Sequence, residues 1–277
     1  MFEQLVDDAA MFPPGNASAA DAVFAHLGYR GAWFAPVIGP LVVPDRALAE
    51  VASHVPPGVT LAVSVINTSG AGGLSALARR EVSGLRVVAV ESALRDLDDL
   101  AANAARIAAA AAELNEAVDV YVELPYAPGW VSAVEVVEAS GLKGKLRTGG
   151  VGAAAYPSRA QLAEQLSVLV EADLPFKATA GLHRAWPNDA TSAAGEQLHQ
   201  HGFLSVMVAL SALIDGCSVA EAAELLTTPR SALGEIVASW HDAAASRIRR
   251  RWRSFGCCGV CDPIDDLVAL DLLRAPA

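Results

Sequence analysis

The chain contains the segments Lys145-Leu146-Arg147-Thr148-Gly149-Gly150 and Lys177-Ala178-Thr179-Ala180-Gly181, each of which places a lysine on a strand that runs into a glycine-containing loop. Strand side chains alternate between two faces, so Lys145 and Arg147 share a face. Two neighbouring strands that direct lysines to one spot are costly unless the spot does chemistry. A lysine crowded by other cations loses its proton more easily, and a neutral amine can attack a carbonyl.

Short apolar strands alternate with Ala-rich helices outward from these segments. Strict alternation indicates a parallel sheet with helices outside, and eight strands in about 250 residues match a closed (β/α)8 TIM barrel. A doubly wound sheet is the alternative, but no Gly-x-Gly-x-x-Gly follows the first strand. The expected strands are Leu5–Ala9, Ala32–Ile38, Thr60–Ile66, Leu85–Val90, Val118–Leu124, Gly144–Thr148, Phe176–Ala180 and Trp252–Gly256.

The spacing of the strands breaks once, between the seventh and the eighth. Helices are expected there near Phe203–Asp215, Val219–Leu226 and Ser231–Arg250, and a closing helix over Pro263–Leu273. We therefore expect a single barrel domain over residues 1–277 with a helical insertion at about 185–250.

Helix start signals support the alternation. Ser18, Asp45 and Asp96 each precede a helical stretch, and Ser158 with Gln161 forms a capping box. The run Ser69–Gly73 follows the third strand and reads either as a phosphate-wrapping loop or as a flexible barrel loop.

The charge balance restricts the class of partner. The 277 residues include 20 basic and 31 acidic side chains, a formal net charge of −11. Nucleic acid and anionic membranes require basic surface, so we expect neither as a partner. The N-terminal residues lack the pattern of a secretory signal, and the longest apolar run, Phe203–Ile214, is too short to cross a bilayer. We expect a cytoplasmic protein, and the Ala-rich helix leaves homo-oligomerisation open.

Four cysteines lie at Cys217, Cys257, Cys258 and Cys261. In a reducing compartment thiols are favoured over disulfides. The Cys258 and Cys261 spacing would suit a metal, but no second ligand pair at comparable spacing exists. We expect no metal.

The carboxyl ends of barrel strands meet at the active site, so acids at those ends become candidates. Asp119, Tyr121 and Glu123 face the lumen, with Glu123 beside Lys145. Glu91 ends the fourth strand, and Asp7 with Asp8 ends the first. The alternative to a catalytic site is a structural ion network that fills the barrel.

The two lysine segments, with Thr148-Gly149 and Gly181 after their lysines, resemble strands six and seven of the deoxyribose-phosphate aldolase family. That family consists of class I, Schiff-base aldolases on (β/α)8 barrels, which use no cofactor. The resemblance implies that Lys145 is the nucleophile and that Lys177 lowers its pKa. Val122-Glu123 and Val6-Asp7-Asp8 resemble the ends of its fifth and first strands. The resemblance also implies a phosphate site at Gly181-Leu182 and the Phe255-Gly256-Cys257 turn.

The chain also departs from the family pattern. Leu146 and Arg147 stand where the family has small hydroxyl residues, and the fourth strand offers Glu91 in place of an aspartate. The long segment after strand seven places His199 and His201 where a lid could contact substrate. These departures imply a different substrate.

The expected reaction is attack of Lys145, held neutral by Lys177 and Arg147, on a small carbonyl or phosphorylated substrate to form an iminium that permits carbon–carbon cleavage. Glu123, with Glu91 or Asp8, would move the protons. His183 either hydrogen-bonds the substrate or caps a turn. The residues expected to contact substrate are Arg147, Thr148, Gly149, Thr179, Gly181, His183 and Gly256.

Two other functions fit the same residues. In a non-Schiff-base isomerase or lyase, Lys145, Arg147 and Lys177 would form an anion pocket with Glu123 as the base. In a non-catalytic ligand-binding barrel, the charges at the mouth would only hold a ligand.

Overall fold

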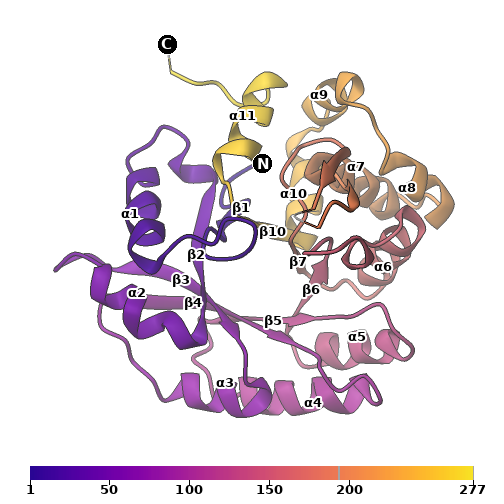
Figure 1. Ribbon diagram of the computed structural model, residues 1–277. Coiled ribbons are helices and arrows are strands. Elements are labelled where there is room, and N and C mark those ends of the chain that lie inside the picture. Colours follow the sequence, from indigo (N-terminus) through magenta and orange to yellow (C-terminus); the bar gives the residue numbers. More distant parts are fainter. Residues whose placement is uncertain (193, 277) are drawn as a thin grey trace.

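The computed structural model describes residues 1–192 and 194–276, and its central element is a closed barrel of parallel strands. Around the barrel the strand order is β1-β10-β7-β6-β5-β4-β3-β2, so β10 closes the ring between β7 and β1. Figure 1 shows the helices packed outside the strands. The predicted (β/α)8 barrel is therefore confirmed.

The strands of the barrel are β1 Val6–Asp8, β2 Ile38–Pro44, β3 Leu61–Asn67, β4 Leu85–Ala93, β5 Asp119–Glu123, β6 Lys143–Arg147, β7 Phe176–Thr179 and β10 Trp252–Cys257. The helices that follow the first seven strands are α1 Ala19–Tyr29, α2 Leu48–His54, α3 Gly70–Ala78, α4 Leu100–Ala111, α5 Trp130–Ala139 and α6 Arg159–Glu171, and then α7 Phe203–Ile214. The outer faces of the strands and the inner faces of the helices form one apolar core.

The second strand differs from the prediction. Residues 32–37 form turns and the 3-10 helix Ala35–Val37, and β2 begins only at Ile38. Pro40 and Pro44 argue against a strand there because proline cannot donate a ladder hydrogen bond. The pairing of β1 with β2 shifts register beside Pro40, and this irregularity accommodates the proline.

The helix caps are partly as predicted. The Ser18 hydroxyl accepts from the Asp21 backbone N–H, and the capping box of Ser158 and Gln161 is formed. Asp99, not Asp96, caps α4. Asp45 is the first residue of the 3-10 helix Asp45–Ala47, and its carboxylate accepts bonds from the backbone N–H and the hydroxyl of Thr68 instead of capping α2.

The glycine run Ser69–Gly73 begins α3, so it is neither a flexible loop nor an extended phosphate-wrapping loop. The Asn67 side chain accepts a bond from the Ser69 N–H and donates one to the Gly70 carbonyl. A Cβ at Gly73 would lie 2.1 Å from the Asn67 amide oxygen. Gly73 therefore makes room for the side chain that holds the helix start.

The segment between β7 and β10 contains more than helices. It opens with an antiparallel hairpin, β8 Asn188–Thr191 and β9 Gln197–Gln200, which the sequence analysis does not predict. After α7 come α8 Val219–Leu225, α9 Arg230–Ala238 and α10 Asp242–Arg251, so the helix expected over Ser231–Arg250 is in fact two helices. His241 caps α10 and marks this break. The closing helix α11 is Cys261–Ala269.

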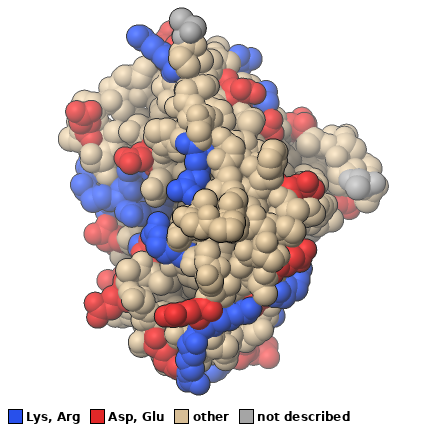
Figure 2. Space-filling model, turned by 90° about the vertical axis from the view of Figure 1, so that its left-hand side faces the viewer, with Lys and Arg blue, Asp and Glu red and all other residues tan. Residues whose placement is uncertain are grey.

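The surface carries charges of both signs. Figure 2 shows acidic and basic side chains interspersed over one face of the molecule, among larger uncharged areas. Among the described residues, the helices are too short or too polar to cross a bilayer.

Gly202, just before α7, lies against the backbone of Trp186, and a Cβ there would come within 2.4 Å of the Trp186 Cα. We expect Gly202→Ala to lower the free energy of unfolding by about 1–3 kcal/mol, because an added methyl group would force the packed backbone apart. Urea denaturation measures this.

Gly28→Ala in α1 is the matched control, because its Cβ position has no neighbour within 4 Å other than adjacent residues and the backbone of its own helix. It should raise the free energy of unfolding by up to about 1 kcal/mol, since alanine is the better helix former. An unchanged urea midpoint for Gly202→Ala would contradict the close packing.

Candidate active site

Glu91 on β4 is the centre of a polar cluster inside the barrel. One of its carboxylate oxygens accepts bonds from Lys177 Nζ at 2.6 Å and from the Ser64 hydroxyl at 2.7 Å. The other oxygen lies 2.8 Å from Lys145 Nζ. Both lysines and Glu91 are buried. The two lysines do meet at one spot, as the sequence indicates, and that spot is a carboxylate.

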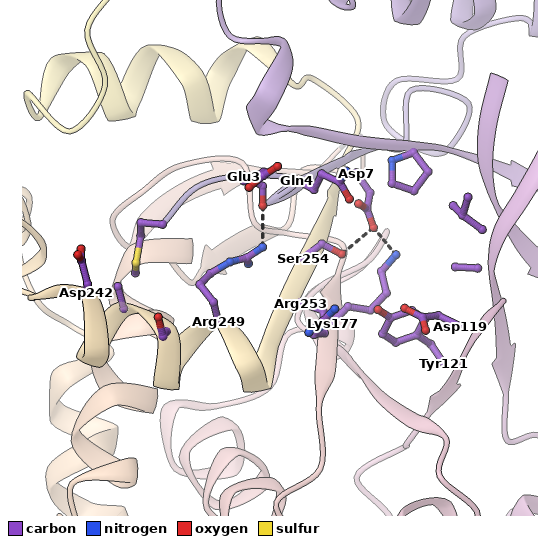
Figure 3. A pocket seen from close by; sticks show the side chains of 16 residues that line it. Glu3, Gln4, Asp7, Asp119, Tyr121, Lys177, Asp242, Arg249, Arg253 and Ser254 are labelled. Atoms are coloured by element: carbon purple, nitrogen blue, oxygen red, sulfur yellow. Dashed lines mark hydrogen bonds and ion pairs between the residues drawn. The ribbon is translucent and has the colours of Figure 1, made fainter. Parts of the chain in front are cut away.

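The cluster extends from Lys177 to the first strand. Lys177 Nζ donates to Asp7 Oδ2 at 2.5 Å, and the Ser254 hydroxyl on β10 donates to the same oxygen at 2.8 Å (Figure 3). Gly39 on β2 makes room for this carboxylate, because a Cβ there would lie 2.1 Å from Asp7 Oδ1.

The cluster extends from Lys145 to the carboxyl ends of the strands. Lys145 Nζ lies 3.1 Å from Glu123, the last residue of β5. Arg147, the last residue of β6, donates to both oxygens of Glu123, at 2.8 and 3.4 Å. Arg147 is about half exposed, so this end of the cluster reaches solvent.

The six residues form one chain of contacts in which acids and bases alternate. The register explains part of it, since Glu123 pairs with Lys145 and Lys145 pairs with Lys177 across neighbouring strands. The contacts then cross the lumen to β4 and β1. We call this the ion chain, and its members in order are Asp7, Lys177, Glu91, Lys145, Glu123 and Arg147.

The ion chain controls which groups are charged. Burial alone would lower the pKa of Lys177, but the carboxylates of Asp7 and Glu91 outweigh burial and hold this pKa far above its usual range. Burial alone would raise the pKa of Glu91, but Lys145 and Lys177 outweigh it and hold this pKa far below its usual range. Glu123 behaves in the same way, since Lys145 and Arg147 outweigh its burial and lower its pKa.

These contacts correct one expectation. The nearest charged groups around Lys145 are the carboxylates of Glu91 and Glu123, not the cations of Lys177 and Arg147. Crowding by cations is therefore not the arrangement that the structure shows. The sequence places Glu123 beside Lys145, but the contact of Glu91 with both lysines crosses the lumen from β4 and is not specified by a local pattern.

Asp8, expected to be a proton carrier, lies outside the cluster. Its carboxylate is buried and accepts bonds from the Ala10 N–H and from His26 of α1, whose Nδ1 lies 2.9 Å away. Asp7 and Asp8 point to opposite faces of β1, so Asp7 takes the place in the lumen. Asp8 is therefore not among the carboxylates that contact the lysines, Asp7 is, and the role of Asp8 in proton transfer stays a prediction.

The loops after β6 and β7 pack against each other. The Thr148 hydroxyl donates to the Ala180 carbonyl at 2.6 Å, so it is occupied. A Cβ at Gly149 would lie 2.8 Å from the Gly181 Cα, and Gly181 has a φ of +75°, which favours glycine. Thr148, Gly149 and Gly181 therefore have a packing role here, and their contact with substrate stays a prediction.

Thr179 and Gly256 are paired on β7 and β10, and a Cβ at Gly256 would lie 3.7 Å from the Thr179 hydroxyl oxygen. Phe255–Cys257 are part of β10, so they form a strand and not the turn expected there, and phosphate binding at these residues stays a prediction. His183 lies apart from the ion chain, with Nδ1 3.7 Å from the Cys257 sulfur and 3.8 Å from the Cys258 sulfur. Burial lowers the pKa of His183.

Two serines that the sequence does not single out complete the cluster: Ser64 donates to Glu91 and Ser254 donates to Asp7. The ring of Tyr121, expected to face the lumen, lies beneath Lys177, 5.3 Å from Nζ. One simple signal was available: the chain has three lysines, Lys143 and the two of the cluster, and all lie on β6 and β7.

The four cysteines are free thiols. Within the described residues, no group of three or more His, Cys, Asp or Glu side chains is arranged to hold a metal ion. His199 on β9 is exposed, with Nδ1 2.6 Å from Asp189 of β8. His201 is buried, and its Nε2 donates to the Pro157 carbonyl at 2.8 Å.

Comparisons with known proteins concern the fold alone. No protein-family model matches the sequence, and no curated protein matches it. Solved structures similar to this chain include the carboxyl transferase domain of Rhizobium etli pyruvate carboxylase with pyruvate and biocytin, at 14% identity and a TM-score of 0.45, covering 100% of this chain and 50% of that one. The complete pyruvate carboxylase of Rhizobium etli is similar at 12% identity and a TM-score of 0.46, with 100% and 29% coverage. This chain thus spans half or less of those chains.

Glu91→Gln should destabilise the protein strongly. Loss of the charge would leave two buried ammonium groups beside a neutral amide, and breaking a buried pair costs about 3–5 kcal/mol. Asp119→Asn is the control, because Asp119 pairs with Lys143 at a partly exposed position, where such pairs contribute about 0–1 kcal/mol. Urea denaturation of both variants measures the difference. Equal losses of unfolding free energy in Glu91→Gln and Asp119→Asn would contradict the importance of Glu91 for the ion chain.

Stability should fall in acid because of His201. Burial lowers its pKa, and the bond to Pro157 offsets only part of this. Below pH about 6.5 the histidine binds a proton in the unfolded chain but not in the folded chain. The contribution of His201 to the free energy of unfolding is therefore complete above pH 6.5 and declines as the pH falls from there towards the lowered pKa.

His201→Gln should therefore flatten the loss of melting temperature between pH 6.5 and 5, measured by circular dichroism at a series of pH values. Burial also lowers the pKa of His183, so this residue should account for part of the pH dependence that remains in the variant. Identical slopes for His201→Gln and the unaltered protein would refute this assignment.

Proposed function

We propose that this protein is a lyase that makes or breaks a carbon–carbon bond of a small carbonyl compound through a Schiff base on Lys145, in the manner of the deoxyribose-phosphate aldolase family. The observation that carries the proposal is the position of Lys145. Its Nζ lies 2.8 Å from Glu91 and 3.1 Å from Glu123, on the side of the barrel where the strands end. Active sites of such barrels lie at that end.

The two lysines have different roles in this proposal. Lys177 donates to both Asp7 and Glu91, and these carboxylates raise its pKa far above the usual range, which favours the ammonium ion over the neutral amine that a nucleophile requires. Because Lys177 shares Glu91 with Lys145, a fixed positive charge stands close to the reacting amine. Lys145 is the lysine that remains to form the covalent bond.

Glu123 carries out the proton transfers in this proposal. The lowered pKa of this carboxyl keeps it ionised, so it can accept a proton first. The Lys145 amine adds to the substrate carbonyl, and loss of water gives an iminium. The bond between the α and β carbons of the substrate then breaks and its electrons move towards the iminium to give an enamine, while Glu123 accepts the proton of the β hydroxyl and the β carbon leaves as an aldehyde. Protonation of the enamine and addition of water restore the amine.

Arg147 is suited to hold the substrate. Its guanidinium is about half exposed at the mouth and is already oriented by Glu123. A planar guanidinium binds a carboxylate or phosphate through two parallel hydrogen bonds. We therefore expect a substrate that carries one of these groups in addition to its carbonyl.

One observation favours a second function. Both lysines are ion-paired, and Lys177 in particular is held as a cation. Charged lysines would serve an isomerase or lyase without a Schiff base, by stabilising an enolate while Glu123 acts as the base. The two functions differ in whether Lys145 becomes covalently attached to the substrate.

Borohydride trapping distinguishes the two functions. The protein is incubated with small aldehydes, ketones and sugar phosphates, reduced, and mapped by peptide mass spectrometry. Since the chain has only three lysines, each adduct is assigned directly. We expect an adduct on Lys145 that requires reductant, persists in Lys143→Arg and disappears in Lys145→Arg. Trapping at Lys177 would reverse the roles, and no trapping at any lysine would favour the enolate mechanism.

A further inference from the structure

A cavity of about 600 Å³ opens at the opposite end of the barrel, where the strands begin. Its wall includes the residues before β1, the starts of β5 and β10, and one side of α10. Figure 3 shows Arg249 and Arg253 in this wall, with Asp7, Tyr121 and Lys177 reaching it from the barrel interior. Its volume is in the range of small-molecule sites.

Two arginines of this wall lack an acidic partner. Within the described residues, neither Arg249 nor Arg253 forms an ion pair. Arg249 donates instead to the backbone carbonyls of Glu3 and Trp252, both at 2.8 Å, and these bonds fix its guanidinium in place. Burial lowers the pKa of Arg249 to about 10, and the neighbouring charge of Arg253 acts in the same direction.

Among the described residues, the acids of the cavity form no ion pair with these arginines, although the charges of Asp7 and Glu3 partly offset the lowering of the Arg249 pKa by burial. Asp7 is bound to Lys177 and Ser254, and Asp119 is paired with Lys143. Glu3 accepts a hydrogen bond from Arg249 with its backbone carbonyl, not with its carboxylate. Asp242 lies in the first turn of α10 and Arg249 in the last, so the two are separated along the helix. Two cations that repel each other, and that have no ion-pair partner among the described residues, therefore lie on one wall of the cavity, which Tyr121 also lines.

We propose that this cavity is a second binding site, in which Arg249 and Arg253 hold the phosphate or carboxylate group of a small anionic molecule. A guanidinium binds either group through paired hydrogen bonds. The Tyr121 hydroxyl, which makes no hydrogen bond within the described residues, is a further donor facing the same space. Lys145, Glu123 and Arg147 do not line this cavity, although Lys177 and Asp7 of the ion chain do, so the site is distinct from the group that would react in the proposed lyase.

Calorimetric titration of the full chain with inorganic phosphate, and separately with malonate, tests the proposal. Arg253 is exposed, so Arg253→Ala should fold, and melting curves check this. Arg250→Ala is the matched control: it removes the same charge from a neighbouring exposed arginine of α10 that does not line the cavity.

We expect saturable binding of at least one anion by the unaltered protein and by Arg250→Ala, and about tenfold weaker binding by Arg253→Ala, as the loss of a charge-assisted hydrogen bond predicts. Binding of phosphate alone would indicate a phosphorylated ligand, and binding of malonate alone a carboxylate. Lys145→Arg should bind as tightly as the unaltered protein. Absence of saturable binding, equal loss in Arg250→Ala and Arg253→Ala, or loss in Lys145→Arg alone would each overturn the proposal.

Discussion

The carboxylate of Glu91 is the constraint on which the interior of this barrel depends. Barrels of this class usually fill their interior with layers of apolar side chains. Here one buried carboxylate binds two buried lysines and a serine, and a buried charge is tolerated only when it is paired and hydrogen-bonded. Each further member of the ion chain follows from this requirement. Asp7 is the second ion-pair partner of Lys177, and Glu123 is the second partner of Lys145. Arg147 in turn pairs with Glu123.

The same arrangement gives the two ends of the barrel different properties. At the carboxyl ends of the strands, the last members of the ion chain are Glu123 and the half-exposed Arg147, which can contact a substrate. Towards their beginnings, Asp7 and Lys177 line the cavity that also contains Arg249 and Arg253. Lys177 therefore connects the two ends, since one of its partners lines that cavity and the other also binds Lys145.

Local patterns predicted much of the fold and less of the site. Alternating strands and helices, and the caps Ser18 and Ser158, depend on nearby residues and were predicted correctly. The second strand was misplaced because Pro40 argues against a strand unless the irregular register beside it is known. The hairpin of β8 and β9 is polar and lacks the apolar alternation that identifies a strand.

The composition of the site is predicted less completely than the fold. Four charged residues are expected inside the barrel because each occupies an alternating position near the end of a strand: Lys145, Lys177, Glu91 and Glu123. The choice between Asp7 and Asp8 depends on which face of a three-residue strand turns inwards, and a shift of one residue reverses it. The partners of each lysine come from residues far away in sequence, 86 positions for Glu91 and 170 for Asp7 in the case of Lys177. No local pattern specifies such contacts.

The most direct test of the ion chain is the charge state of Lys177, measured by nuclear magnetic resonance on protein labelled with ¹³C and ¹⁵N in lysine, with the three signals assigned through single Lys→Arg variants. The carboxylates of Asp7 and Glu91 raise the pKa of Lys177, so its signals should still be those of an ammonium ion at pH 11, above the ordinary lysine pKa of about 10.4. Signals of a neutral amine at or below pH 10 in the folded protein would contradict the account.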